Sequence, residues 1–256
     1  MSILLGSHVD REKPLEGAAI RGADVIQINL SAPQSWRDPV LRGDEELLRG
    51  SGLPIFVHSP YLLNPASINP EQRSKTKRAL IAQLKAAELV GARGLVVHGG
   101  HPTGEGTLQD GVNGWLEVLS GVKSSVRVLI ENTAGGSAAV ARRLDGLALL
   151  FPTLRGAGFD VGFVLDTCHS HAGGLASESV IKDVLGIVGV IDLVHLNDSK
   201  DPAGSGRDRH QNLGFGEVRG EFLMSVVREC NAPIVVETPG GFEAQRDDIT
   251  WVRERL

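Results

Sequence analysis

The sequence has few of the features that mark secreted, disulfide-stabilised or membrane proteins. Its 256 residues include two cysteines, Cys168 and Cys230, which are too few for a disulfide framework. No apolar stretch approaches the roughly 18 residues that a membrane span requires. The N-terminus also lacks the basic and then apolar layout of a signal peptide. We therefore expect a cytoplasmic protein that does not enter a membrane.

Common nucleotide-binding motifs are absent as well. The chain has no GxxxxGK[ST] phosphate loop, and Gly156-Ala157-Gly158 precedes a strand-like run instead of a helix, so it is not a dinucleotide fingerprint. The composition is that of a globular protein, with 41% hydrophobic and 22% charged residues. The length suits one α/β barrel of about 250 residues.

Short runs rich in Val, Ile and Leu recur along the chain and are typical of parallel strands that are buried on both faces. The segments between them have helical patterns, and the clearest helix spans Pro70 to Val90, with Asn69 as its N-cap and Gly91 after its end. This alternation predicts one α/β domain over residues 1–256, a (β/α)₈ or TIM barrel. A doubly wound sheet is the alternative, but it would spread the strand ends along a line. The expected strands are Leu4–His8, Val25–Leu30, Ile55–His58, Leu95–His98, Val128–Glu131, Gly162–Asp166, Leu193–Asn197 and Ile234–Glu237.

Six of these runs end in a side chain that can bind a metal ion. One such histidine is more often structural, but six ionisable residues at corresponding positions indicate a shared site at the C-terminal rim of the barrel. Imidazole and carboxylate ligands without thiolates suit zinc or manganese. The residues are His58, His98, Glu131, Asp166 with the nearby His169, His195 and Glu237.

The segment 194–216 adds a second cluster of polar residues. Asp208 and His210 are two positions apart, so both side chains point the same way if this loop is extended. The loop could be an ordinary solvated segment, or it could bring this pair back over the barrel mouth. In the second case its basic residues, Lys200, Arg207 and Arg209, would lie close to a metal-bound phosphate.

Two single residues allow more than one interpretation. Tyr61, the one tyrosine of the chain, could pack in the interior or be presented to a ligand above the rim. Cys168 stands between Asp166 and His169 but has no assigned basic partner. We interpret Cys168 as a small buried residue and not as a nucleophile or ligand.

Several longer motifs occur in a fixed order: HSPYLLNPAS, VVHGGH, IENTAGG, LDTCHSHAGG, HLNDSKDPAGSGRDRHQNLGFGEV and VVETP. DTCH, HLNDS and DRHxNLGxG are the most specific of them. Together they resemble the motifs of the endonuclease IV family of apurinic/apyrimidinic (AP) endonucleases, and the match extends from GSHVD at the N-terminus to Glu237. The resemblance implies a (β/α)₈ barrel with three zinc ions that incises DNA 5′ to abasic sites.

The resemblance also implies a set of nine metal ligands, none of which is missing from the chain. Manganese could replace zinc at one or more of the three sites. Three divalent ions would change the net charge from −5 to +1, so the acidity of the chain does not exclude DNA. His58 and His98 resemble the ligands of the first ion, and Glu131 resembles the carboxylate that bridges it to the second. The other ligands of the second ion would be Asp166, His195 and Glu237. The ligands of the third ion would be His169, Asp208 and His210.

The implied reaction leaves a 3′-hydroxyl, with Glu131 and Glu237 as catalytic residues that orient a metal-bound hydroxide between the first two ions. Trimming of blocked 3′ ends is also expected. The implied partner is double-stranded DNA with abasic sites or blocked 3′ ends, bound by a monomer that is associated with the nucleoid through its substrate.

Tyr61 matches a family residue that inserts into the duplex, and Gln34 stands where some members place an inserted arginine. We expect both to contact DNA, together with Lys200, Arg207 and Arg209. Pro65 and His171 also depart from the family pattern. We expect these departures to affect substrate handling and not the metal ligands.

Two other functions are compatible with the fold. A sugar isomerase or epimerase of the xylose-isomerase-like barrels would share the carboxylates Glu131, Asp166 and Glu237, but would not require His169, Asp208 and His210. A non-catalytic protein that binds damaged DNA would be favoured by the loss of a ligand, and no ligand is lost.

Overall fold

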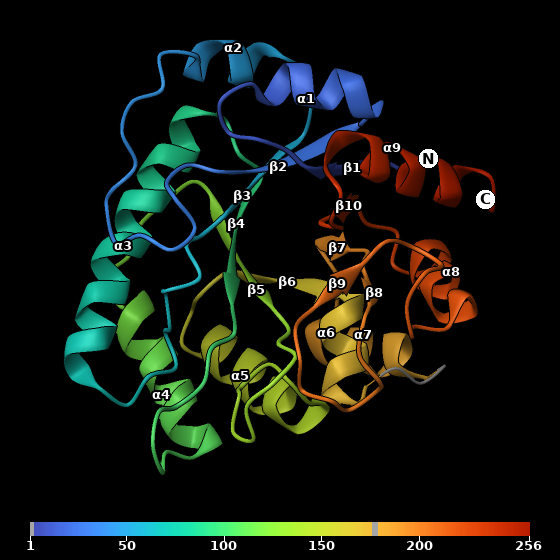
Figure 1. Cartoon of the computed structure of the whole chain (residues 1–256). Coiled ribbons are helices and arrows are strands. Elements are labelled where there is room, and N and C mark those ends of the chain that lie inside the picture. Colours follow the sequence, from blue (N-terminus) through green and yellow to red (C-terminus); the bar gives the residue numbers. More distant parts are fainter. Residues whose placement is uncertain (1–2, 176–178) are drawn as a thin grey trace.

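Eight parallel strands form a closed barrel in the computed structural model, which describes residues 3–175 and 179–256 (Figure 1). Residues 1, 2 and 176–178 of the domain expected over 1–256 lie outside the described residues. The strand order around the barrel is β1-β10-β7-β6-β5-β4-β3-β2, and every pairing is parallel. This confirms the predicted TIM barrel. The strands are β1 (Leu5–His8), β2 (Val25–Asn29), β3 (Ile55–His58), β4 (Gly94–His98), β5 (Arg127–Glu131), β6 (Val161–Asp166), β7 (Leu193–His195) and β10 (Ile234–Val236).

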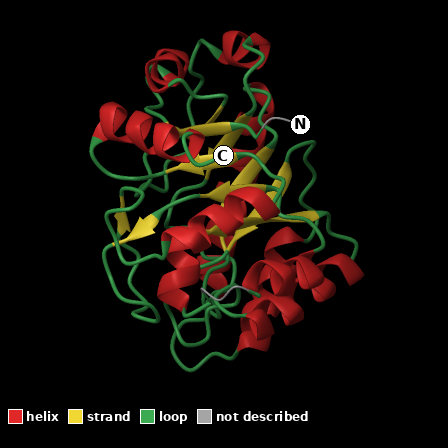
Figure 2. Ribbon diagram, turned by 90° about the vertical axis from the view of Figure 1, so that its right-hand side faces the viewer, coloured by secondary structure: helices red, strands yellow, loops and turns green. Residues whose placement is uncertain are grey.

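Helices surround this barrel, as the two views in Figures 1 and 2 show. The predicted helix over 70–90 is α3: the side chain of Asn69 accepts hydrogen bonds from the backbone N–H groups of Glu71 and Gln72, and Gly91 follows the helix end with a positive φ. Among the described residues, no helix combines the length and apolarity needed to cross a membrane. The helices are α1 (Pro14–Arg21), α2 (Glu45–Gly50), α3 (Pro70–Leu89), α4 (Leu108–Leu119), α5 (Leu144–Gly156), α6 (Thr167–Gly173), α7 (Val180–Val188), α8 (Gly220–Glu229) and α9 (Gly241–Arg253).

The barrel interior is filled by one apolar layer to which almost every strand contributes. Its members are buried and form a cluster of their own, separate from the larger core between strands and helices. Side chains alternate along a strand, so the residue two positions later faces the same interior, one step nearer the carboxyl end. The layer consists of Val25, Phe56, Val96, Leu129, Val164, Leu193 and Val235, with Leu4 packed against it.

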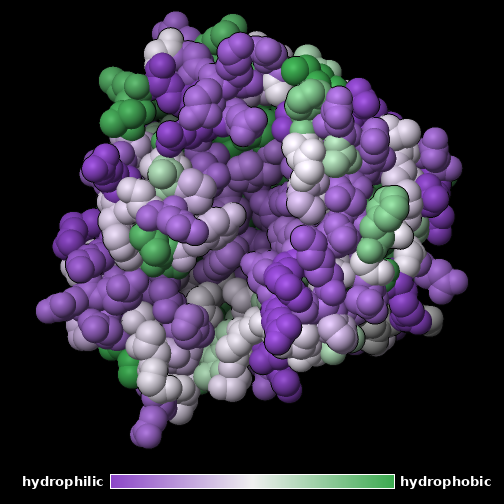
Figure 3. Space-filling model, viewed as in Figure 1, coloured by the Kyte–Doolittle hydropathy of each residue, from purple (hydrophilic) through white to green (hydrophobic). Residues whose placement is uncertain are grey.

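This alternation positions the candidate ligands. His58 follows Phe56 by two residues, and Glu131 follows Leu129 in the same way. The same step leads from the layer to His98, Asp166, His195 and Glu237. The candidate ligands therefore form the next layer above the apolar layer, at the C-terminal rim of the barrel. Figure 3 shows a hollow lined by hydrophilic residues near the middle of this face of the molecule.

A short hairpin extends beyond the barrel. Its strands β8 (Asp198–Ser199) and β9 (His210–Gln211) pair antiparallel, with Ser199 opposite His210. The carboxylate of Asp198 accepts hydrogen bonds from the backbone N–H groups of Gly214, Gly216 and Val218. These bonds fold the segment after β9 back onto the hairpin, which returns His210 to the rim.

Candidate metal centre

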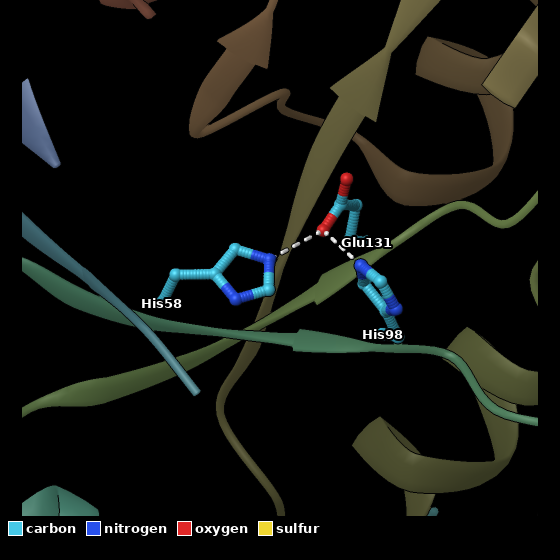
Figure 4. A group of neighbouring side chains, drawn as sticks. All are labelled: His58, His98 and Glu131. Carbon is cyan, nitrogen blue, oxygen red and sulfur yellow. Dashed lines mark hydrogen bonds and ion pairs between the residues drawn. The ribbon is translucent and has the colours of Figure 1, made fainter. Parts of the chain in front are cut away.

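The first group of candidate ligands joins His58 of β3, His98 of β4 and Glu131 of β5 (Figure 4). The Nε2 atoms of both histidines lie 3.2 Å from the same carboxylate oxygen, Oε2 of Glu131. Nδ1 of His58 lies 2.7 Å from the carbonyl oxygen of Ser59. Since that carbonyl only accepts, the His58 hydrogen resides on Nδ1, and Nε2 is left with the lone pair that a metal ligand needs.

The second group contains Glu131, Asp166, His195 and Glu237. Nδ1 of His195 lies 3.0 Å from Oε1 of Glu131, 3.3 Å from Oε2 of Glu237 and 4.0 Å from Oδ2 of Asp166. Glu131 thus directs Oε2 to the first group and Oε1 to the second. A carboxylate that directs one oxygen to each of two groups could hold an ion in both.

The third group joins His169 of α6 with Asp208 and His210 of the hairpin. Each oxygen of the Asp208 carboxylate lies 3.1 Å from one histidine Nε2. Both side chains of the hairpin therefore face His169, as the spacing of two predicts for an extended loop. Asp166 caps α6 by accepting the backbone N–H of His169 at 2.6 Å, so the second and third groups are connected through one residue.

Two buried atoms of the third group fit the presence of a cation. Nε2 of His169 and Nε2 of His210 are buried and form no hydrogen bond of good geometry, although an oxygen of Asp208 lies 3.1 Å from each. Nδ1 of His169 already lies 2.9 Å from the carbonyl oxygen of Asn132, which fixes the hydrogen on that side of the ring. Buried polar atoms are nearly always satisfied, so two imidazole nitrogens that face one carboxylate without a well-formed hydrogen bond fit a metal site.

The pKa values of the buried ionisable residues also fit a site for cations. Burial by itself would raise the pKa of Glu131, but the neighbouring imidazoles of His195 and His98 hold it well below its usual range. Burial lowers the pKa of His195, but the charges of Glu237 and Glu131 outweigh this and raise it to about 9. Buried carboxylates need positive charge beside them, which protonated imidazoles provide here and metal ions could replace.

Tyr61 lies next to the first group and not in the core. Its side chain is half exposed, and its ring centroid lies 5.4 Å from that of His58 and 5.6 Å from that of His98. It lines two depressions, one with His98 and Asp208 and another with Glu237. Of the two interpretations of this tyrosine, the geometry favours presentation to a ligand.

Gln34 is exposed in the segment between β2 and α2. The backbone N–H of Tyr61 donates to the carbonyl oxygen of the adjacent Pro33 at 2.9 Å. The segments that carry Gln34 and Tyr61 are therefore joined by this hydrogen bond.

The basic residues of the hairpin that we expect to contact DNA are exposed, but two of them form ion pairs within the protein. Arg207 and Arg209 both form ion pairs with Asp201, at 3.4 Å and 2.5 Å, whereas Lys200 is exposed beside them. The two arginines therefore share one compensating negative charge, and their contact with DNA stays a prediction.

The remaining departures and Cys168 lie inside the molecule. Nε2 of His171 lies 3.0 Å from the carbonyl oxygen of Asp201, and Pro65 is buried against α4. Both side chains are buried, so an effect on the substrate would pass through the neighbouring loops. Cys168 is fully buried, and burial together with Asp166 raises the pKa of its thiol to about 12, which disfavours a thiolate, although its sulfur lies near possible ligand atoms of Asp166 and His210.

Sequence reasoning missed several polar residues that hold the candidate ligands. Asn197 donates to Oδ2 of Asp166 at 2.7 Å and accepts the backbone N–H of Glu237 at 2.8 Å. Gln27 contacts both His195 and Glu237. A signal was present: in the β2 run VIQIN, two amides alternate with apolar residues and so share the inward face.

The chain is similar to known proteins over nearly its whole length. Residues 15–255 match the profile of the xylose isomerase-like TIM barrel family. "Probable endonuclease 4" of Mycobacterium leprae is 45% identical over 253 residues, which cover 99% of both chains. The crystal structure of endonuclease IV from Thermus thermophilus superposes with a TM-score of 0.84 at 31% identity and covers 98% of both chains.

Another solved structure resembles this chain in its fold and much less in its sequence. The crystal structure of a D-tagatose 3-epimerase-like protein covers 99% of both chains with a TM-score of 0.75, but at 17% identity. At this identity the likeness shows the shared fold alone. On its profile match and its full-length identity to these relatives, the chain belongs to the endonuclease IV family within the xylose isomerase-like TIM barrels.

Proposed function

We propose that this protein is a metal-dependent AP endonuclease that hydrolyses the phosphodiester 5′ to abasic sites in duplex DNA and leaves a 3′-hydroxyl. The convergence of nine histidine and carboxylate side chains in three adjoining groups carries the proposal. The names of the relatives support a nuclease. Trimming of blocked 3′ ends belongs to the same proposal, because both reactions break the bond between phosphorus and the 3′ oxygen of a sugar.

Three divalent ions, zinc with manganese possible at one or more sites, would occupy the three groups. Such ions neutralise phosphate charge and lower the pKa of a bound water toward about 7. His58 and His98 would hold the first ion, and Glu131 would lie between the first ion and the second. The second ion would also be held by Asp166, His195 and Glu237. The third ion would be held by His169, Asp208 and His210.

Glu131 and Glu237 have different surroundings, and this suggests different roles. Glu131 is buried and contacts imidazoles on both of its oxygens, so it holds the first two groups together. Glu237 retains 13% side-chain exposure and lines the depression that Tyr61 borders. Glu237 is therefore the carboxylate that can contact and orient an attacking water.

The DNA would enter across the joined segments of Gln34 and Tyr61. An abasic nucleotide has lost its stacking and pairing, so moving it out of the duplex costs less than moving an intact one. Tyr61 would fill the space left in the stack, with the rim depressions beside its ring. Lys200, Arg207 and Arg209 would contact phosphates along the hairpin.

The third group argues against a sugar isomerase. Such an enzyme could use the carboxylates of the first two groups, but it would not require Nε2 of His169 and Nε2 of His210 to face the carboxylate of Asp208. A phosphodiesterase, by contrast, needs positive charge beside its leaving oxygen, and these two nitrogens with Asp208 could hold it there.

The test is incision of a duplex that carries one abasic analogue, next to the same duplex without it. We expect a nick on the 5′ side of the analogue that a DNA polymerase can extend, loss of the nick after chelation, and its return with zinc or manganese. Tight binding without a nick would instead identify a damage-binding protein. Interconversion of sugars without any nick would identify an isomerase.

A further inference from the structure

Gln27 occupies in β2 the position at which six other strand ends carry a candidate ligand. It follows Val25 of the apolar layer by two residues, as His58 follows Phe56. Its side chain is fully buried. A buried amide requires hydrogen-bond partners, so its contacts show what it does.

The orientation of the Gln27 amide is determined by Glu237. Nε2 of Gln27 lies 2.6 Å from Oε1 of Glu237, and a carboxylate only accepts hydrogen bonds. The nitrogen must therefore face Glu237, which turns Oε1 of Gln27 toward Nε2 of His195 at 2.8 Å. Because an amide oxygen only accepts, His195 must carry its hydrogen on Nε2. In the neutral ring, Nδ1 then carries the lone pair that a metal ion at the second group needs.

Two further residues hold the amide from the other side. Nε2 of Gln27 also lies 3.0 Å from Nδ1 of His8, which therefore acts as an acceptor. Nε2 of His8 then donates to Oδ1 of Asn29 at 2.9 Å, and Nδ2 of Asn29 donates to the carbonyl oxygen of His58 at 3.0 Å. The chain of hydrogen bonds has one consistent direction and connects the first group with the second.

We propose that Gln27 is a positioning residue for the second group, which sets the tautomer of His195 and holds one oxygen of Glu237. His8 and Asn29 fix the orientation of its amide. This inference rests on the proposed metal centre and assigns a role to β2, which supplies none of the nine candidate ligands.

The test compares Gln27→Met with Gln83→Met. Methionine keeps nearly the same volume but removes the hydrogen bonds. Gln83 is a matched control, since it is also buried and its amide donates to Ser31 at 2.7 Å, outside the three groups. We expect Gln27→Met to bind zinc about 10- to 100-fold more weakly in a chelator competition, and the control to stay within about twofold of the wild type. The absorption spectrum of the cobalt-loaded protein should change in Gln27→Met alone.

The wild-type protein provides a second readout that does not depend on the folding of a variant. Nitrogen-15 NMR of the zinc-loaded protein should place the His195 hydrogen on Nε2. A hydrogen on Nδ1, or equal zinc affinity of Gln27→Met and wild type, would overturn the proposal. The two proposals can fail separately. If Gln27→Met binds zinc more weakly and the wild-type His195 carries its hydrogen on Nε2, but the zinc-loaded wild type does not cut abasic DNA, the proposed function is refuted and the role of Gln27 stands.

Discussion

Asp208 and His169 meet across the mouth of the barrel, where Oδ2 of Asp208 lies 3.1 Å from Nε2 of His169. One residue comes from the hairpin and the other from α6, so the contact closes the site over the strand ends. The second oxygen of Asp208 lies 3.1 Å from His210. Asp208 thus supplies the negative charge of the third group of candidate ligands.

Replacing Asp208 with Asn should slow the chemical step by at least about 100-fold, because even residues that only support a metal ligand contribute 10- to 100-fold. Binding of abasic DNA should largely persist, since the first two groups and Tyr61 are unchanged. Single-turnover incision and a binding titration measure the two effects. Asp247→Asn is the matched control, because that carboxylate is exposed in α9. Normal incision by Asp208→Asn would show that the third group is wrongly assigned.

Metal binding should release protons and weaken as the pH falls. Burial lowers the pKa values of His195 and His210, but nearby carboxylates raise both to about 9. Below that pH each ring in the metal-free protein carries a second proton, and a bound ion must displace it. Titration calorimetry at neutral pH in buffers of different ionisation enthalpy should give heats that differ between buffers. Identical heats in all buffers would contradict this prediction.

Replacing Tyr61 should affect DNA binding through its ring and not through its hydroxyl. Burial, Glu237 and Glu131 raise the pKa of Tyr61, so the hydroxyl stays protonated at neutral pH. Tyr61→Ala should weaken binding of abasic duplex by about 1–3 kcal/mol, the usual value of one aromatic stacking contact. Tyr61→Phe should bind nearly as the wild type does. Fluorescence anisotropy measures both, and equal binding by the Ala variant would exclude insertion of the ring.

Trp115 should be important for stability. It is fully buried in α4, and its Nε1 donates to the carbonyl oxygen of Gly99 at 2.7 Å, directly after His98. Trp115→Phe removes this donor and part of the buried volume, so we expect the free energy of unfolding to fall by about 2–3 kcal/mol. Trp36→Phe, at a 39% exposed position, should change it by less than about 0.5 kcal/mol. Urea titrations compare the two, and a similar loss in both would refute the argument.

The sequence predicted the barrel well because its signals are local. Each strand is a short apolar run, and the bounds expected at Ile55–His58 are those observed for β3. The run expected at Leu193–Asn197 ends earlier, at His195. There the chain leaves the barrel so that Asn197 can bond to Asp166 and to the backbone of Glu237. Those bonds join residues far apart in the chain, and no local pattern encodes them.

The amino-acid order alone determined the approximate bounds of the strands and the presence of ligand-type residues at their C-terminal ends, since both are local features of the apolar runs. Tertiary structure decided which oxygen of Glu131 faces which group, which nitrogen of His195 is free, and that Asp201 pairs with the hairpin arginines. These features depend on distances and hydrogen-bond directions between separate elements, which exist only after the barrel has closed.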